Sequence, residues 1–496
     1  MNRALRRISL ASLVLFVLLL LNANYVQAFE ANSMTGDPGN GRTFSEQFQY
    51  QRGAIITEDN KVIAESLPVK GIYKYQRYYP AGAEYAPVTG FDSIYSETGI
   101  ELAEDRQLSG SDPALAVHNL IDLVTGKPKK GATVQLTINS VAQQTAYSAL
   151  KAMGHEAGVV ALNPQSGAVL ALASYPTFDP NQLATFDGTQ LNKVDKALIA
   201  DPNHPLIDNA ISTTFPPGST FKIVTSSTAL STGKVADVNT PVYAPTKLTL
   251  PQTTNQLVND GGETCNNGSN PTGTGKVPLI YAFTVSCNTV FGALGEQVGG
   301  SALRAQANKF GMNDSNLTIP LPVVPSNYPP VSEADFTAYS AIGQYSDTVT
   351  PMQEAMFSAA IAHNGALMKP YLVQKITAPD LTPIFAATPN TFSNPVTPAV
   401  ASQVKQMMIS VVQSPAGTAH ATAFLPNIEI AGKTGTAQNG VNNGSLDDAV
   451  FTCFAPANNP QIAVGVVVKG GGFGADAAAP IAVKIIEAYL ASLAKQ

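Results

Sequence analysis

The chain has no tryptophan, three cysteines and five histidines, and only 13% of its 496 residues are charged. Three cysteines make neither a zinc pattern nor a disulfide framework, and the net charge of −6, without a basic patch, argues against nucleic-acid binding. No GxGxxG or GxxxxGKS/T motif occurs in a usable context for a nucleotide. The histidines show no metal-ligand or triad spacing, so we interpret all five as structural: His118, His155, His204, His363 and His420.

The N-terminus predicts export. Arg3, Arg6 and Arg7 precede an uncharged run over residues 8–28, which is typical of a signal sequence or a membrane anchor. The dense apolar centre at 13–21 is short for a spanning helix, and residues 26–28 resemble a cleavage site, so both interpretations stay open. Because the positive end stays inside, we expect a single-pass plasma-membrane protein with the rest of the chain outside the cytoplasm.

The rest of the chain predicts two domains. Residues 29–130 are rich in Tyr, Gly and Pro with short alternating stretches, which indicates an elongated, mostly β module. Residues 131–496 predict an α+β domain with an antiparallel sheet flanked by helices. Within it, 158–162 and 168–173 are nearly continuous in apolar residues around a turn, which predicts a hairpin covered on both faces. We also expect strands at 134–138, 431–438, 450–454 and 462–468, helices at 140–153, 278–294, 351–363, 398–412 and 480–495, a polar excursion at 177–204 and irregular loops at 232–275.

Residues 215–230 predict a nucleophile. Two prolines and a glycine form a turn, and an apolar run that indicates a buried helix follows. Ser219 lies near the positive end of the helix dipole, and Lys222 lies one turn later on the same face. Burial lowers the pKa of a lysine, whose neutral amine can then accept a serine proton. The pattern alone is weak evidence, since Ser-x-x-Lys also begins at Ser148, Ser231, Ser402 and Ser492.

Two later motifs make the Ser219 pattern a stronger indication of a catalytic site. Ser286-x-Asn288 and Lys433-Thr434-Gly435 follow in order, and each occurs once. We expect the first on a helix and the second on a strand. The ordered set resembles the penicillin-recognising serine enzymes, which comprise penicillin-binding proteins and class A β-lactamases. The resemblance implies a transpeptidase domain with the serine β-lactamase-like fold.

Flanking segments narrow the resemblance to class B penicillin-binding proteins, most closely the actinobacterial PbpA-like type. It covers nearly the whole chain after residue 28, with 29–130 as the non-catalytic pedestal, 131–496 as the transpeptidase domain and no glycosyltransferase module before them. The matching segments are Arg52-Gly53-Ala54-Ile55, Tyr79-Pro80-Ala81-Gly82, Val88-Thr89-Gly90, Thr98-Gly99-Ile100-Glu101, Leu108-Ser109-Gly110, residues 174–181, Gly343-Gln344, Thr350-Pro351 and residues 433–438.

The resemblance implies a serine D,D-transpeptidase that cross-links peptidoglycan stem peptides. Ser219 would attack the penultimate D-Ala carbonyl to form an acyl-enzyme, which an amine of a neighbouring stem peptide then resolves. Lys222 would be the general base, and repulsion from Lys433 would help to lower its pKa. Ser286 would pass a proton to the leaving amine, and Asn288 would orient Lys222 and the substrate.

The remaining motif residues would bind substrate. Thr434 and Thr436 would receive the terminal carboxylate, and Gly435 would leave room for substrate along the strand. Backbone N–H groups of Ser219 and Thr436 would form the oxyanion hole. The resemblance also implies acylation by penicillin and other β-lactams, no cofactor or metal, and a glycan polymerase and division or elongation proteins as partners.

The cysteines depart from the family pattern. Cys287 is the middle residue of the Ser286 motif, where β-lactamases usually carry Asp, and Cys453 lies where the family often has glycine. In an exported protein Cys265 and Cys287 could form a disulfide near the site. Two free, buried thiols are an equal alternative, and we expect Cys453 only to pack.

Three other functions stay open as alternatives. A β-lactamase or D,D-carboxypeptidase needs a base aimed at water, and Glu263-x-x-x-Asn267 has the spacing of the class A element but precedes Ser286 instead of following it. A non-catalytic β-lactam sensor usually carries a cytoplasmic signalling region, and only seven residues precede the apolar run. The N-terminal module could mainly dock division or elongation proteins, which is compatible with catalysis.

Overall fold

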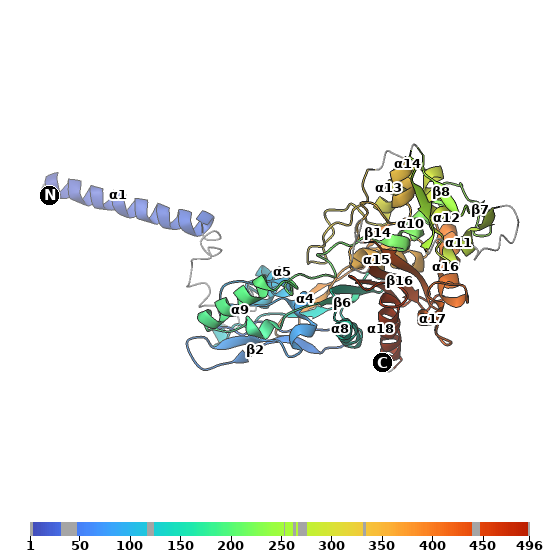
Figure 1. The fold of residues 1–496 in the computed structure, drawn as a ribbon. Helices are drawn as coiled ribbons and strands as arrows, with labels where there is room; N and C mark the ends of the chain where they lie inside the picture. The colour runs from blue at the N-terminus through green and yellow to red at the C-terminus, as the bar shows by residue number, and fades with distance from the viewer. Residues whose placement is uncertain are drawn as a thin grey trace.

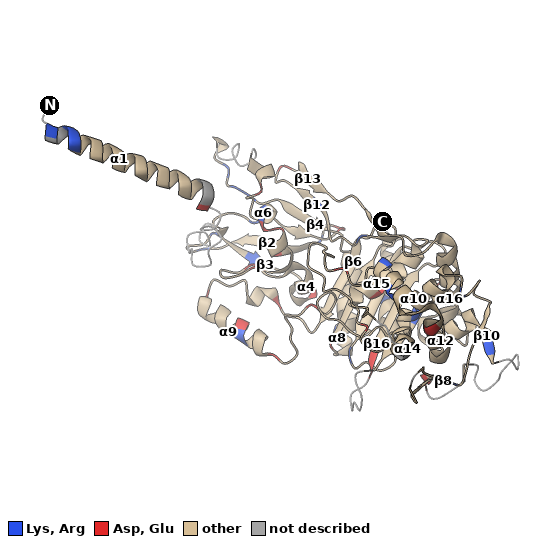
Figure 2. Ribbon diagram, turned by 90° about the horizontal axis from the view of Figure 1, so that it is seen from above, with Lys and Arg blue, Asp and Glu red and all other residues tan. Residues whose placement is uncertain are grey.

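The computed structural model describes residues 3–30, 47–116, 124–251, 253–260, 264–265, 275–330, 334–438 and 447–494. Helix α1 (Arg3–Tyr25) continues into a short π-helical turn, η1 (Val26–Glu30). Its residues 6–25 are long and apolar enough to cross a membrane and are not buried against the rest of the protein. Figure 2 shows positive residues at its N-terminal end and then a length of helix without charge. A membrane anchor and a signal sequence both fit this helix.

A five-stranded antiparallel sheet forms the centre of the C-terminal domain, in the order β15-β16-β17-β5-β6. Nearly all its residues are buried, as the apolar runs predict, because helices cover both faces (Figure 1). The predicted hairpin is confirmed as β5 and β6. The strands are β5 (Ala157–Leu162), β6 (Val169–Tyr175), β15 (Ala431–Ala437), β16 (Asp448–Ala455) and β17 (Ile462–Val468).

The helices form two layers around this sheet. Helices α8 (Ser140–Met153) and α18 (Ala478–Leu493) pack together and contact strands of the sheet. Asn139 caps α8 as predicted, since its side chain accepts hydrogen bonds from two backbone N–H groups. Helix α15 (Pro351–Ala362) is buried along its whole length, between the sheet and α16 (Pro398–Gln413). The other helices of this part are α10 (Lys222–Ser231), α11 (Leu279–Thr284), α12 (Asn288–Val298), α13 (Gly300–Lys309), α14 (Ala334–Ser340) and α17 (His420–Ala423).

The N-terminal module is built on a six-stranded sheet in the order β13-β12-β4-β1-β2-β3. Two of its strands come from much later in the chain, so the sheet joins the module to the catalytic half. The strands are β1 (Ile55–Ile56), β2 (Val62–Pro68), β3 (Tyr75–Tyr78), β4 (Thr133–Leu136), β12 (Val373–Thr377) and β13 (Pro383–Ala386). Short helices lie between them: η2 (Gly82–Glu84), α4 (Ala86–Thr89), α5 (Gly99–Ala103), α6 (Asp105–Leu108) and η3 (Pro113–Leu115).

The structure adds detail to one local prediction and corrects two others. The excursion at 177–204 contains η4 (Pro180–Gln182) and helix α9 (Gly188–Ala200), and it docks on the N-terminal module because Asn181 exchanges two hydrogen bonds with the Tyr79 backbone. The predicted helix 278–294 is broken between α11 and α12. The region 232–275 contains short strands, and the small two-stranded sheets of the domain use β7 (Pro241–Tyr243), β8 (Lys247–Thr249), β9 (Gln256–Val258), β10 (Lys276–Pro278), β11 (Leu367–Met368) and β14 (Thr391–Ser393).

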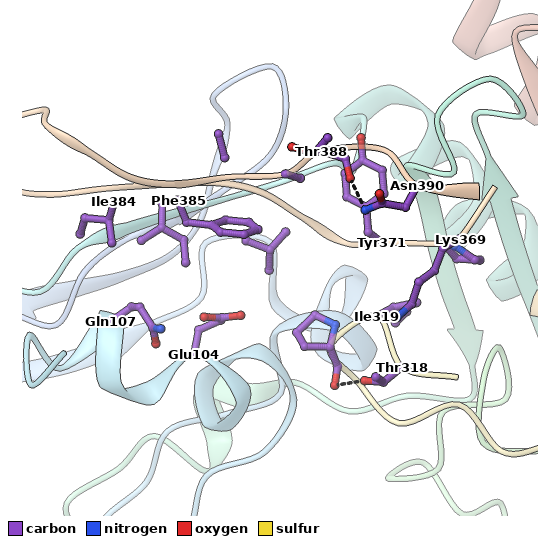
Figure 3. A pocket seen from close by; sticks show the side chains of 16 residues that line it. Glu104, Gln107, Thr318, Ile319, Lys369, Tyr371, Ile384, Phe385, Thr388 and Asn390 are labelled. Atoms are coloured by element: carbon purple, nitrogen blue, oxygen red, sulfur yellow. Dashed lines mark hydrogen bonds between the residues drawn. The ribbon is translucent and has the colours of Figure 1, made fainter. Parts of the chain in front are cut away.

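A cavity of about 620 Å³ lies where the two parts of the chain meet. Figure 3 shows Ile384 and Phe385 of β13 on one side, and Glu104 and Gln107 of the N-terminal module on the other. This cavity contains none of the three predicted motifs. The site that they form lies in a different cavity.

Candidate active site

Ser219 lies in a tight turn against the edge strand of the central sheet. The turn is a short 3-10 helix, η5 (Gly218–Phe221), that leads directly into α10. Gly218 has a φ of +55°, and a Cβ there would lie 2.6 Å from the Thr436 carbonyl oxygen and 3.2 Å from its nitrogen. Glycine therefore lets the turn approach β15 closely. This contact brings the backbones of residues 218 and 436 together, where the oxyanion hole is predicted.

Lys222 reaches both predicted serines. Its Nζ atom lies 2.9 Å from Ser219 Oγ, 2.8 Å from the Ser286 carbonyl oxygen and 3.2 Å from Ser286 Oγ. It also lies 2.6 Å from Asn288 Oδ1. Lys222 is wholly buried, and burial lowers its pKa to about 7, although Asp260 acts in the opposite direction.

The partners of Lys222 fit a neutral amine. A neutral lysine has two N–H donors and one lone pair. The Ser286 carbonyl and Asn288 Oδ1 can only accept hydrogen bonds, so they use both donors. The lone pair is then available to the Ser219 hydroxyl. In its neutral form, Lys222 could therefore accept the Ser219 proton directly, without a third residue.

Ser286 connects the two lysines. Lys433 Nζ donates to Ser286 Oγ at 2.8 Å and to the Thr434 carbonyl at 3.0 Å. Burial, helped by repulsion from Lys222, holds the pKa of Lys433 well below its usual value, and Asp260 offsets part of this. Ser286 lies between α11 and α12, with a φ of +59°. The prediction that it lies on a helix is wrong, because α11 ends at Thr284 and the left-handed Ser286 precedes α12, which begins at Asn288.

Residues 258–265 hold the Ser286-x-Asn288 motif in place. Asn288 Nδ2 donates to Asp260 Oδ1 at 3.1 Å and lies 3.4 Å from the Val258 carbonyl, so its Oδ1 faces Lys222. A disulfide joins Cys265 to Cys287, with Cα atoms 5.5 Å apart, which confirms the disulfide alternative. Cys453 is a buried free thiol, as expected. Glu263 and Asn267, the β-lactamase-like pair, lie outside the described residues, as does His118.

Strand β15 forms the other wall of the site. Thr434 Oγ1 lies 2.6 Å from Thr418 Oγ1, a contact that the sequence did not suggest. A Cβ on Gly435 would lie 2.6 Å from the Pro217 carbonyl oxygen and 3.1 Å from Thr220 Cγ2. The absence of a side chain at Gly435 therefore allows the nucleophile turn to pack on β15, in addition to any role toward substrate.

A cavity of about 330 Å³ is lined by Ser219, Ser286, Thr434 and Thr436 of the three motifs, together with a loop whose place at the site sequence reasoning missed. The three motifs do not include the glycine-rich loop at 470–474. In the structure Phe473, Gly474 and Asp476 line the cavity. A Cβ on Gly474 would lie 2.3 Å from the Gly435 carbonyl, so the loop packs on the motif strand. In the described part of the chain, no cluster of His, Cys, Asp or Glu could hold a metal ion.

Comparisons with known proteins define the class. The family model described as penicillin binding protein transpeptidase domain matches residues 157–487. A second model, the penicillin binding protein A dimerisation domain, matches residues 52–134. The chain belongs to the penicillin-binding proteins and has their α+β transpeptidase fold.

Relatives of the PbpA type match this chain over nearly its whole length, and relatives of the MrdA type match a smaller part of it. The chain is 40% identical over 500 residues to the peptidoglycan D,D-transpeptidase PbpA of Mycolicibacterium smegmatis, which covers 99% of both chains. It is 28% identical to the peptidoglycan D,D-transpeptidase MrdA of Escherichia coli, over 87% of this chain and 73% of the relative. Among solved structures, the ceftriaxone acyl-enzyme complex of penicillin-binding protein A from Mycobacterium tuberculosis matches with a TM-score of 0.85 and 36% identity, over 90% of this chain and 100% of that one.

Proposed function

We propose that this chain is a membrane-anchored peptidoglycan D,D-transpeptidase that works through an acyl-enzyme on Ser219 and is acylated there by β-lactams. One observation carries the proposal. The continuous contacts Ser219–Lys222–Ser286–Lys433 join all three motifs beside one cavity. The relatives' names, and the acyl-enzyme complexes of the mycobacterial protein, support the same reaction.

The contacts suggest the order of proton transfers. Neutral Lys222 takes the Ser219 proton while Oγ attacks the penultimate D-Ala carbonyl, and N–H groups of Ser219 and Thr436 stabilise the oxyanion. The resulting lysine ammonium passes a proton through the Ser286 hydroxyl to the leaving D-Ala amine. Lys433 donates to Ser286 and so orients this hydroxyl for the transfer. An acceptor amine then attacks the acyl-enzyme, and the proton flow reverses.

The other motif residues serve position and binding. Asn288, fixed by Asp260, keeps its oxygen on Lys222. Thr434 and Thr436 lie beside the cavity, where they would bind the terminal carboxylate of the donor peptide, and Gly435 supports the wall between them.

The proposed organisation of the chain is a membrane anchor followed by two domains. Helix α1 anchors it with residues 29–130 and 131–496 outside the cytoplasmic membrane, as a pedestal and a catalytic domain. A glycan polymerase and division or elongation proteins are the proposed partners, and the pedestal would offer them a surface.

The test uses the full chain in detergent with a fluorescent penicillin, and Ser219→Ala as the control. A Ser219-dependent adduct that lasts many minutes, together with D-Ala release and cross-linked product from paired stem peptides, supports a transpeptidase. Fast loss of the adduct would indicate a β-lactamase, and a stable adduct without D-Ala release would indicate a sensor. The absence of any adduct would refute the site itself.

A further inference from the structure

A wholly buried carboxyl group lies directly behind the nucleophile turn. Glu354 is on α15, and no part of it is exposed. Its Oε1 atom lies 2.7 Å from Oγ1 of Thr220, the residue that follows Ser219. Its Oε2 atom is also buried and has no hydrogen-bond partner among the described residues. No motif of the family explains this acid, and the proton transfers proposed above do not use it.

Counting protons shows which form of Glu354 fits. Thr220 Oγ1 also lies 2.8 Å from the Pro217 carbonyl oxygen, and a hydroxyl has only one proton to donate. If Glu354 were ionised, both neighbours of this hydroxyl would be acceptors and one contact would lack a hydrogen. If Glu354 is a neutral acid, it donates to Thr220, which donates to Pro217. Only the neutral acid makes both contacts hydrogen bonds.

The surroundings favour the same form. Burial raises the pKa of Glu354 to about 8, and the Thr220 contact lowers it only in part. The elements packed on α15 are β5, β11, β16, β17 and α16, with η5 at the Thr220 contact. In the described residues their titratable side chains are Asp448 and Cys453 on β16 and Lys405 on α16, and Lys222 follows η5. None of these four is hydrogen-bonded or ion-paired to Glu354.

We propose that Glu354 is a positioning residue, a neutral carboxylic acid whose proton completes a relay from Glu354 through Thr220 to the Pro217 carbonyl. The relay ties α15 to both sides of Ser219, because residue 217 precedes the nucleophile and residue 220 follows it. It fixes the position of Ser219 Oγ relative to Lys222 Nζ. It also fixes the position of the Ser219 backbone N–H group in the proposed oxyanion hole. This inference rests on the proposed acylation of Ser219. It adds a group that acts through the turn without touching substrate.

The acid makes acylation sensitive to alkaline pH. When Glu354 ionises, it can only accept, so the Thr220 hydroxyl turns to the carboxylate and the Pro217 carbonyl loses its donor. We expect the penicillin acylation rate of the native chain to fall as pH rises above about 8. Glu354→Gln offers an N–H donor to Thr220 at every pH. It should therefore acylate at pH 7 within about threefold of the native rate and show no decrease in rate between pH 8 and pH 9.5.

Two further variants remove the relay. Glu354→Leu fills the same space without a donor, and Thr220→Val removes the hydroxyl with little change in shape. Each should slow acylation at least about tenfold at pH 7, since small misplacements of a reacting atom cost up to about 10²-fold. Thr220→Val keeps the test informative if a leucine at 354 prevents folding.

Asp208→Asn is the matched control. Burial also raises the pKa of Asp208, to about 7, and its Oδ2 likewise lacks a hydrogen-bond partner in the described residues, but it lines a separate cavity. The acylation rate of this variant should decrease above about pH 8, as that of the native chain does. The proposal is overturned if the acylation rate of Glu354→Gln also decreases above about pH 8. It is likewise overturned if Glu354→Leu and Thr220→Val acylate within twofold of the native rate at pH 7.

A second readout needs no activity. A carboxyl whose folded pKa is raised loses its stabilising effect as pH rises from about 4.5 to about 8. The melting temperature of Glu354→Gln, relative to that of the native chain, should therefore increase as pH rises from about 4.5 to about 8. An unchanged difference would mean that Glu354 is ionised in the folded state and would also overturn the proposal. If the native chain forms no penicillin adduct at all, the proposed function fails, while this titration still reports on Glu354.

Discussion

Glu101 should be the residue on which the stability of the N-terminal module depends most. Its carboxylate lies 2.7 Å from Arg52 Nε and 2.6 Å from Arg77 Nε. The side chains of the three residues are 0, 4 and 1% exposed. Burial alone would raise the pKa of Glu101, but Arg77 and Arg52 outweigh it and lower that pKa. Glu101→Gln removes the negative charge. Arg52 keeps Asp92, Glu97 and Asp105 within 3.7 Å, but buried Arg77 loses its carboxylate partner among the described residues, which should cost about 3–5 kcal/mol of unfolding free energy. That is a third or more of the stability of many domains.

An exposed ion pair of the same length is the control. Lys469 and Glu156 also lie 2.7 Å apart, but their side chains are 54 and 32% exposed. Glu156→Gln should cost at most about 1 kcal/mol. Because the chain has no tryptophan, urea unfolding of both variants is best followed by far-ultraviolet circular dichroism. Equal losses for the two variants would refute the argument that burial, and not the ion-pair contact itself, sets the cost.

Three further predictions concern the catalytic half. The penicillin acylation rate should rise with pH through the Lys222 pKa of about 7, and Lys222→Arg, which stays charged, should lower it roughly 10²–10⁴-fold at every pH; an active arginine variant would exclude Lys222 as the base. Gly343 has a φ of +74° and a Cβ there would lie 2.0 Å from the Gly218 carbonyl, so Gly343→Ala should move the turn and abolish acylation while the far-ultraviolet spectrum is kept. Cys265 and Cys287 are 22 residues apart, so Cys265→Ser should cost about 3 kcal/mol; alkylation of the unfolded, unreduced native chain should label a single thiol, and three labelled thiols would refute the disulfide.

The sequence was sufficient for the class and for the motif residues because both leave local signals. A Pro-Pro-Gly turn before an apolar helix, and a Lys-Thr-Gly at a strand edge, are patterns of neighbouring residues. The apolar runs likewise predicted the hairpin of β5 and β6, since a strand buried on both faces must be apolar throughout. A local pattern gave a wrong prediction where it continued across a break between two helices. The apolar stretch 278–294 predicted one helix, although the left-handed conformation of Ser286 separates two helices there.

The features that the sequence could not give depend on contacts between distant segments. Thr418, between α16 and α17, reaches Thr434, and the loop at 470–474, which follows β17, packs on Gly435. Strands β12 and β13 join the N-terminal sheet from more than 230 residues away from β4, a pairing that no propensity records. Glu354 is the strongest case. In the sequence it is one of three polar residues, with Gln353 and Ser358, in a mostly apolar helix, and the spacing of the apolar residues predicts core. Its meaning appears only when Thr220 is placed 2.7 Å away, because a buried acid beside a single hydroxyl must keep its proton to satisfy both contacts. Motif residues can thus be found from neighbours in the chain, while the groups that set their geometry are found only from neighbours in space.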